Sequence, residues 1–238
     1  RLDEARHALE QARGLADRVG QPISVALFGQ EYLSRALDEG WEELAAVFEP
    51  LAASTKPGLT WARGWIYAIS VRIGARRGQE DVALRFLGLL VPWLERAPAW
   101  TIAFPQMACD AAEALWLLQR LDHVDVVERA LREKVVGPDF RSPTVDGRLA
   151  LARLSALQGR HDEALAWFVE ARRVLGEQGA RPLLAVADYD EALMYVRRGE
   201  PGDLARARPL LEAARGQFEA IGMTGWICRA DELSRRTG

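Results

Sequence analysis

Prolines and glycines divide this chain at a nearly regular interval. Five prolines lie 35, 41, 45 and 39 residues apart, and each precedes an apolar run with helical periodicity: Pro22, Pro57, Pro98, Pro143 and Pro182. Proline suits the first turn of a helix, where its missing N–H is not needed. Glycines at 40, 78, 159 and 199 close these runs, as glycine does just past a helix end. The spacing predicts a repeated unit of helix, tight turn, helix and loop, with a period of roughly 40 residues.

Similar segments at the two ends of the chain support this repeat. Residues 3–20 and 205–222 align without gaps, and residues 5, 6, 9, 10, 12, 13, 14 and 20 of the chain are identical to those 202 residues later. Residues 159–179 match the same pattern of small and apolar residues. Each of these segments is expected to be the second helix of a unit.

The repeat places helices along the whole chain. We expect first helices at 22–39, 58–77, 99–119, 143–158 and 182–198. We expect second helices at 3–19, 41–54, 79–96, 123–135, 161–178 and 203–221. A last helix near 225–236 follows Thr224, a good N-cap residue. Strand signals are weak, because alternating β-branched runs bounded by turns are missing. The predicted fold is all-α, with residues 1–238 forming a single superhelical domain.

A glycine followed by alanine five residues on, and again seven further, recurs in the predicted second helices. The triplets are Gly40/Ala45/Ala52, Gly159/Ala164/Ala171 and Gly202/Ala207/Ala214. This spacing resembles the tetratricopeptide repeat in a variant with long helices. Leu121 and Val126 depart from it in the unit of predicted helices 99–119 and 123–135. The resemblance implies a right-handed α-solenoid of about five to six hairpins with a terminal capping helix. It says little about function, because such a fold hosts many partners.

The last 60 residues or so have a narrower resemblance. They look like the C-terminal repeat region of large bacterial signalling proteins, in which a nucleotidyl-cyclase, protein-kinase or LuxR-type DNA-binding module is joined to a signal-transducing ATPase. The resemblance implies a regulatory or sensor arm, cut from a longer protein and acting on an effector domain of the parent chain. A stand-alone adaptor or assembly scaffold is the alternative, and a helical enzyme with an active site in its groove is a third.

Composition restricts the class of partner. Of the 238 residues, 49% are hydrophobic and 27% charged, and the net charge is −3. A general nucleic-acid or anionic-membrane binder is usually basic, so neither is expected. No apolar run approaches the ~20 residues of a membrane span. Two distant cysteines, Cys109 and Cys228, suggest a reducing, cytoplasmic location.

Candidate reactive groups have simpler explanations. His161, Asp162 and Glu163 begin a predicted helix, where acidic side chains cap N–H groups and complement the helix dipole. The acidic cluster 188–191 and the arginines at 197 and 198 suggest ion pairs on a solvated face more than a metal site. The three histidines lack ligand spacing and no phosphate-binding loop occurs, so no catalytic residue, metal or cofactor is predicted. Most of the eight tryptophans are expected in the core, although Trp61, Trp65 and Trp100 include candidates for an exposed anchor.

The first helices of such a stack line its inner surface. Counting back from each closing glycine selects side chains that should face inward: Gln30, Ser34, Trp65, Arg72, Arg76, Asp146, Arg153, Tyr189 and Arg197. This set leans basic although the chain is acidic. We therefore expect a groove that receives an acidic or C-terminal segment of a protein partner, with arginine as the paired donor. An ordinary solvated groove is the alternative.

Overall fold

The structure is a computed structural model of the chain and describes residues 2–19, 32–37, 39–53, 62–98 and 103–236. These residues are mostly helical and none of them lies in a β-strand, which confirms the predicted all-α class. In chain order the helices are α1 (Leu2–Arg18), α3 (Trp41–Ala53), α4 (Arg63–Arg76), α5 (Glu80–Arg96), α6 (Phe104–Leu118), α7 (Val124–Leu131), a π-helical continuation η2 (Arg132–Val136), α8 (Gly147–Leu157), α9 (His161–Glu177), α10 (Arg181–Arg198), α11 (Asp203–Ile221) and α12 (Thr224–Arg235).

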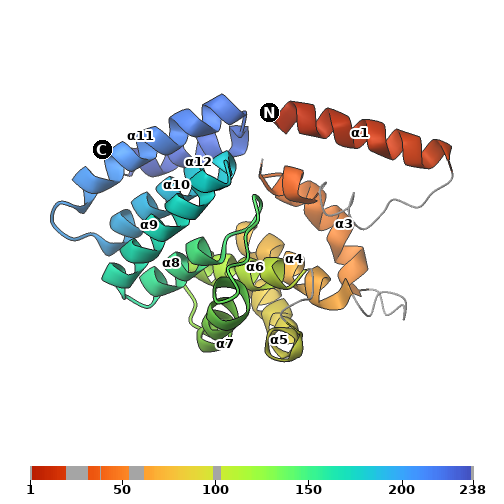
Figure 1. Cartoon of the computed structure of the whole chain (residues 1–238), viewed down its shortest axis with the longest axis horizontal. Coiled ribbons are helices and arrows are strands. Elements are labelled where there is room, and N and C mark those ends of the chain that lie inside the picture. Colours follow the sequence, from red (N-terminus) through yellow and green to blue (C-terminus); the bar gives the residue numbers. More distant parts are fainter. Residues whose placement is uncertain (1, 20–31, 38, 54–61, 99–102, 237–238) are drawn as a thin grey trace.

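Consecutive helices pack as hairpins and the hairpins follow one another around an arc (Figure 1). The pairs α4/α5, α6/α7, α8/α9 and α10/α11 are in contact, and α12 packs on α11. Alternate helices also touch in order, because α4 contacts α6, α6 contacts α8 and α8 contacts α10. These four helices form one layer, and the second helix of each pair packs against it.

Three of the four predicted glycines lie at turns inside hairpins with positive φ, whereas at the turn before α3 that conformation belongs to Glu39, with φ of 62°, and not to Gly40. Gly78, Gly159 and Gly199 follow α4, α8 and α10 with φ of 70°, 74° and 68°, in the left-handed region that suits a residue without Cβ. The α6/α7 hairpin, which is the third unit of the predicted repeat, has Gln119 at the equivalent point, with φ of 55°. The absence of glycine there explains why the repeat is hard to follow in this unit.

Small residues allow the helices of a hairpin to approach closely, as the glycine–alanine spacing predicts. Ala83, Ala164, Ala171, Ala207 and Ala214 are all buried. In the α4/α5 pair, a Cβ built on Gly74 would lie only 3.0 Å from the backbone nitrogen of Ala83. Contact at this distance between backbones leaves no room for a larger residue.

Several helix boundaries differ from the prediction. Helix α8 begins at Gly147, not 143, because the Asp146 side chain accepts hydrogen bonds from the backbone N–H of Arg148 and Leu149, both at 2.9 Å. Helix α12 begins at Thr224 itself, with Met223 in the N-cap position. Of the expected helix 22–39, only 32–37 and 39 are described, and 32–36 is helical. Residues 58–61 and 99–102 also lie outside the described ranges.

Three tryptophans confirm the expectation of core positions. Trp41, Trp116 and Trp226 are buried, whereas Trp65, Trp93 and Trp167 are half-buried. Trp61 and Trp100 lie outside the described residues. No helix in the described ranges has the length and apolar character needed to cross a membrane.

Candidate functional site

Four successive helices of the inner layer each contribute one charged side chain to a continuous set of ion pairs. We call Arg72, Glu113, Arg153 and Asp190, from α4, α6, α8 and α10, the charge ladder. Arg72 Nε donates to Glu113 Oε1 at 2.8 Å, and Arg153 Nη1 donates to Glu113 Oε2 at 3.1 Å. Arg153 Nε donates in turn to Asp190 Oδ2 at 2.8 Å. The charge alternates from helix to helix, so each pair joins neighbouring hairpins.

The ladder occupies the same position in three of the repeats. Arg72 lies six residues before Gly78, and Arg153 lies six before Gly159, where the chain turns with positive φ. Glu113 lies six before Gln119, the residue that replaces glycine in the third unit. Counting back from the closing glycines identifies Arg72 and Arg153. It misses Glu113, the carboxylate they share, because the turn after α6 has Gln119 in place of glycine.

The charged side chains of the ladder are buried, so each ionised group relies on its neighbour of opposite charge for stabilisation. Glu113, Arg153 and Asp190 are at most 5% exposed. Burial tends to raise the pKa of the Glu113 carboxyl, but Arg72, Arg76 and Arg153 together hold it well below its usual range. Burial raises the pKa of Asp190, and Arg153 opposes that rise only in part. Glu113, which three arginines contact, is therefore the electrostatic centre of the inner layer.

A second carboxylate extends the set toward the N-terminal segment. Asp110 of α6 accepts hydrogen bonds from Gln106 at 2.7 Å, from Arg72 at 3.3 Å and from the Tyr32 hydroxyl at 3.3 Å. Burial raises the pKa of Asp110 to about 7, with a smaller contribution of the same sign from Glu113, while Arg72 lowers it. Asp110 is therefore a buried carboxyl that titrates near neutral pH.

The two ends of the arc meet through a group of five side chains that we call the clasp: Glu39, Trp41, Arg76, Trp226 and Arg229. Arg229 of α12 forms an ion pair with Glu39, which lies before α3, and Arg76 Nη1 lies 3.3 Å from the other oxygen of Glu39. The Arg76 guanidinium carbon lies 5.4 Å from the Trp41 ring centre and 4.9 Å from that of Trp226. Cation–π contacts on both rings and an ion pair thus connect residues 190 positions apart.

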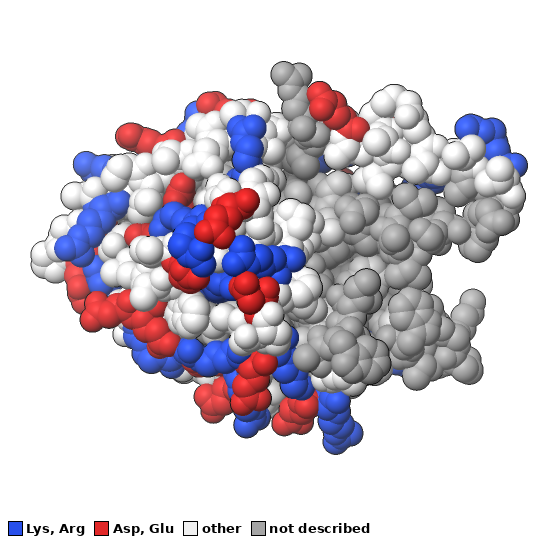
Figure 2. Space-filling view, viewed as in Figure 1, with Lys and Arg blue, Asp and Glu red and all other residues white. Residues whose placement is uncertain are grey.

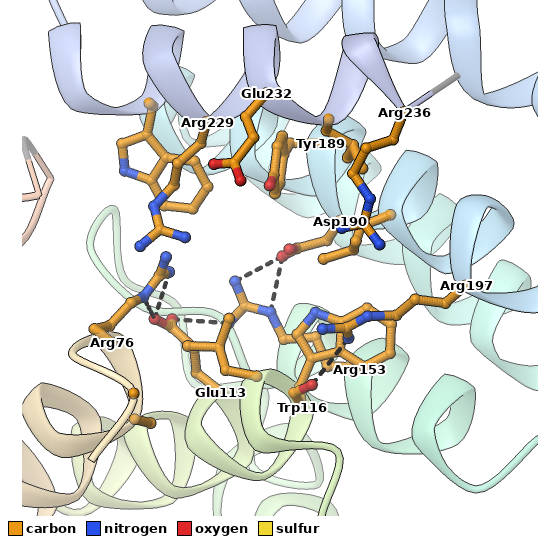
Figure 3. Close-up of a pocket in the computed structure, with 16 residues that line it drawn as sticks. Arg76, Glu113, Trp116, Arg153, Tyr189, Asp190, Arg197, Arg229, Glu232 and Arg236 are labelled. Carbon is orange, nitrogen blue, oxygen red and sulfur yellow. Dashed lines mark hydrogen bonds and ion pairs between the residues drawn. The ribbon is translucent and has the colours of Figure 1, made fainter. Parts of the chain in front are cut away.

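An inner pocket of about 300 Å³ opens beside the clasp (Figure 3). Its walls come from α4, α6, α8, α10 and α12. The charged lining consists of five arginines and three carboxylates: Arg76, Arg153, Arg197, Arg229, Arg236, Glu113, Asp190 and Glu232. Its volume is at the lower end of the range for small-ligand sites.

A smaller cavity of about 40 Å³ lies on the other side of the ladder, lined in part by Leu33, Cys109 and Asp146. Glu113, Arg153 and Trp226 line both spaces, so these side chains form the partition between them. A ligand in the inner pocket would therefore contact charged side chains that are already paired with one another, Glu113 and Arg153.

The structure brings together four of the predicted inward-facing residues at the inner pocket: Arg76, Arg153, Tyr189 and Arg197. Arg72 lies behind the partition, with Arg76 and Arg153 beside it on Glu113. We expected these arginines to offer their charge to a partner. They are instead paired internally, because a buried guanidinium needs a counter-ion.

The remaining predicted residues lie elsewhere. Asp146 caps α8, so its carboxylate is already used by the backbone, and burial raises its pKa. Ser34 is buried in the N-terminal segment. Trp65 packs edge-on against Phe48, with ring centres 6.2 Å apart, outside the pocket lining. Gln30 lies outside the described residues.

Other clusters from the sequence are ion pairs between helices. Asp188 and Glu191 bind Arg172 at 2.7 and 2.6 Å, whereas Arg198 binds Asp203 rather than the acidic cluster. Glu163 makes no cap for α9. It pairs with Arg160 and Arg132, whose hydrogen bonds lower its pKa to about 2 against the opposing effect of burial. No group of three or more potential metal ligands occurs in the described part of the chain.

The described face that Figure 2 presents carries charged side chains of both signs. In Figure 2, basic and acidic side chains alternate over the described face that this view presents. The pocket lining, in contrast, contains more arginines than carboxylates.

No family model matches the chain. No curated protein and no solved structure is significantly similar to it. Function therefore has to be inferred from the pocket itself.

Proposed function

We propose that the chain is a non-enzymatic interaction module that binds a partner segment or ligand in the inner pocket. In this proposal it is the regulatory arm of a bacterial signalling protein. Its fold is a right-handed α-solenoid of five to six tetratricopeptide-like hairpins with α12 as the capping helix. The recurring position of Arg72, Glu113 and Arg153 relative to the hairpin turns supports the repeat.

The charge balance of the pocket carries the functional part of the proposal. Arg76 and Arg153 are matched by Glu113 and Asp190, and Arg229 is matched by Glu39. Arg197 and Arg236 then remain in the lining with Glu232 as the single further carboxylate. A concave, partly apolar site with surplus arginine suits an acidic ligand or segment.

The arrangement supports binding more than catalysis. Glu113 and Asp190, the buried carboxylates of the pocket, are both held by guanidinium groups. The lowered pKa of Glu113 makes this carboxylate a poor general base near neutral pH. The pocket is also shared between α12 and the inner layer, so occupancy would change how α12 packs. That coupling is what a regulatory arm requires.

Selection from a displayed library of random linear peptides tests the proposal. The full chain is the target, and Leu117→Trp, which adds a bulky ring at a half-buried pocket position, is the comparison. We expect enriched peptides rich in Asp and Glu whose affinity falls at least about tenfold on Leu117→Trp, or about 1.4 kcal/mol. Peptides that bind both proteins equally would show that the pocket is not the binding site.

A further inference from the structure

Arg197 is a half-buried cation of the inner pocket whose contacts are made with Trp116 and not with a carboxylate. Its Nη1 donates to the carbonyl oxygen of Trp116 at 2.9 Å, and its guanidinium carbon lies 4.1 Å from the centre of the Trp116 ring. Among the described residues no carboxylate pairs with it. The Nε and Nη2 groups make no hydrogen bond within this part of the chain, and they form the edge with which arginine binds a carboxylate by two parallel bonds.

A second guanidinium faces the same space. Figure 3 shows Arg236 and Glu232 extending from α12 toward the cavity above Arg197. Neither side chain makes a hydrogen bond or ion pair with the described residues. Burial lowers the pKa of Arg197, and the positive charge of Arg236 lowers it further, against an opposing effect of Asp190. Two cations thus share a pocket in which an added negative charge would be stabilised.

The apolar part of the wall offers surface to the rest of a ligand. The indole N–H groups of Trp116 and Trp226 are buried and have no acceptor in the described structure. Leu117, Leu193 and Leu233 line the pocket beside them. Buried donors without partners are uncommon because each costs free energy. The leucines of the wall therefore suit a molecule that has an apolar body.

We propose that the inner pocket binds an organic monocarboxylate, with its carboxylate on the Nε/Nη2 edge of Arg197 and near Arg236, and its apolar body against Leu193 and Leu233. This inference rests on the proposed function and names the ligand chemistry of the same pocket. The net excess of one positive charge, counting Arg197, Arg236 and Glu232, favours a monoanion over a phosphate dianion. The planar fork of arginine matches a carboxylate. The carboxylate can belong to a free acid or to the end of a peptide.

Calorimetric titration of the full chain at pH 7 tests the inference. The probes are N-acetyl-L-leucine, its uncharged amide and inorganic phosphate. A heptapeptide ending in leucine, with a free or an amidated C-terminus, separates the two sources. We expect the acid to bind at least about tenfold tighter than its amide. Binding of the small acid without binding of the free-ended heptapeptide assigns a free organic acid, and binding of the free-ended but not the amidated heptapeptide assigns a chain terminus.

Variants locate the carboxylate. Arg197→Gln should abolish the preference for acid over amide. Arg197→Lys, which keeps the charge but not the fork, should retain part of it. Glu232→Gln should tighten acid binding roughly threefold by removing a like charge. Arg173→Gln, on the exposed face of α9, is the matched control and should change nothing. Circular dichroism checks that each variant is folded.

Three results would overturn the inference: equal binding of acid and amide, a preference for phosphate, or no binding of any acid up to about 10 mM, which corresponds to roughly −3 kcal/mol. If these occur while selected peptides still lose affinity on Leu117→Trp, only the carboxylate assignment fails. If the peptides also bind both proteins equally, the proposed function fails with it.

Discussion

Arg197 is attached to Trp116 in two ways, by a hydrogen bond of 2.9 Å to the Trp116 carbonyl oxygen and by stacking of its guanidinium 4.1 Å from the ring centre. The two contacts fix a long side chain that would otherwise sample many rotamers. A guanidinium fixed in this way binds a ligand with less loss of conformational entropy. The hydrogen bond uses only the Nη1 group of Arg197, so the Nε and Nη2 groups remain available to bind a carboxylate.

Glu113→Gln should be the most destabilising single change in the charge ladder. It removes the charge that Arg72, Arg76 and Arg153 share in a buried site, and breaking such a set costs about 3–5 kcal/mol. Urea denaturation at pH 7 measures the loss. The control is Glu219→Gln on α11, which breaks an exposed pair with Arg215 and should cost less than about 1 kcal/mol. Similar losses for the two variants would contradict a central role for Glu113.

Asp110 gives the fold a pH dependence of defined sign. Its pKa is raised to about 7 by burial, whereas an unfolded aspartate titrates near 3.9. Between about pH 4 and 7 the folded state therefore retains a proton that the unfolded state has lost, so this group makes stability fall as pH rises. Asp110→Asn should gain about 1–3 kcal/mol relative to the wild type between pH 5 and pH 8.

The measurement is the free energy of unfolding at several pH values across that interval. Glu113 acts in the opposite sense, because its pKa is lowered, but its contribution is lost only below its unfolded pKa near 4.3. Asp125→Asn, at an exposed position of α7, is the control. Parallel stability curves for wild type and Asp110→Asn would show that Asp110 does not titrate in this interval.

Much of the fold follows from local sequence, and the site does not. Gly78, Gly159 and Gly199 mark turns because their backbone conformation disfavours other residues. The positions of these glycines in the sequence therefore predict the hairpins. Arg72 and Arg153 are found by counting from those glycines. Their partners, Glu113 and Asp190, belong to other units, and Gln119 hides the register of the third. A partner in space has no signal in a single sequence when it lies about 40 residues away.

The net charge of the pocket is also hard to predict from sequence, because ion pairs between helices cannot be read from it. The inward set leans basic when residues are counted alone, but Arg72, Arg76 and Arg153 lose their free charge once their carboxylates are placed. Arg236 and Glu232 come from the last helix, which the repeat rule does not treat as lining. The pocket therefore depends on how α12 returns to the N-terminal segment through Glu39 and Arg229.

Gly74→Ala tests the close packing of α4 on α5. The added methyl carbon would lie 3.0 Å from the Ala83 backbone nitrogen and 3.2 Å from its Cβ, so the helices must separate. We expect a loss of about 1–3 kcal/mol in thermal or urea unfolding. Gly176→Ala is the matched control, because a Cβ there meets open space within helix α9, and it should stabilise by up to about 1 kcal/mol. Equal effects at both positions would refute close packing as the reason for Gly74.

Arg229→Gln tests the clasp between the two ends of the arc. It removes the ion pair with Glu39 while Arg76 keeps its own contact with that carboxylate. Loss of about 1 kcal/mol should raise amide hydrogen exchange in residues 32–37 and in α12 roughly fivefold. The control is Arg235→Gln on the exposed side of α12, which should leave the exchange unchanged. If exchange in these segments is the same in Arg229→Gln and wild type, the ends are not held by the clasp.

The central claim is that a carboxylate binds beside Arg197 and Trp116, and the most direct measurement is the nitrogen-15 NMR spectrum of the tryptophan side chains. The Trp116 indole N–H signal is assigned by its loss in Trp116→Phe, and the protein is titrated with N-acetyl-L-leucine and with its amide. We predict that the acid shifts the Trp116 signal in a saturable manner, that the amide does not, and that Arg197→Gln removes the shift. A Trp116 signal that does not move with the acid, or moves equally with the amide, would contradict the claim.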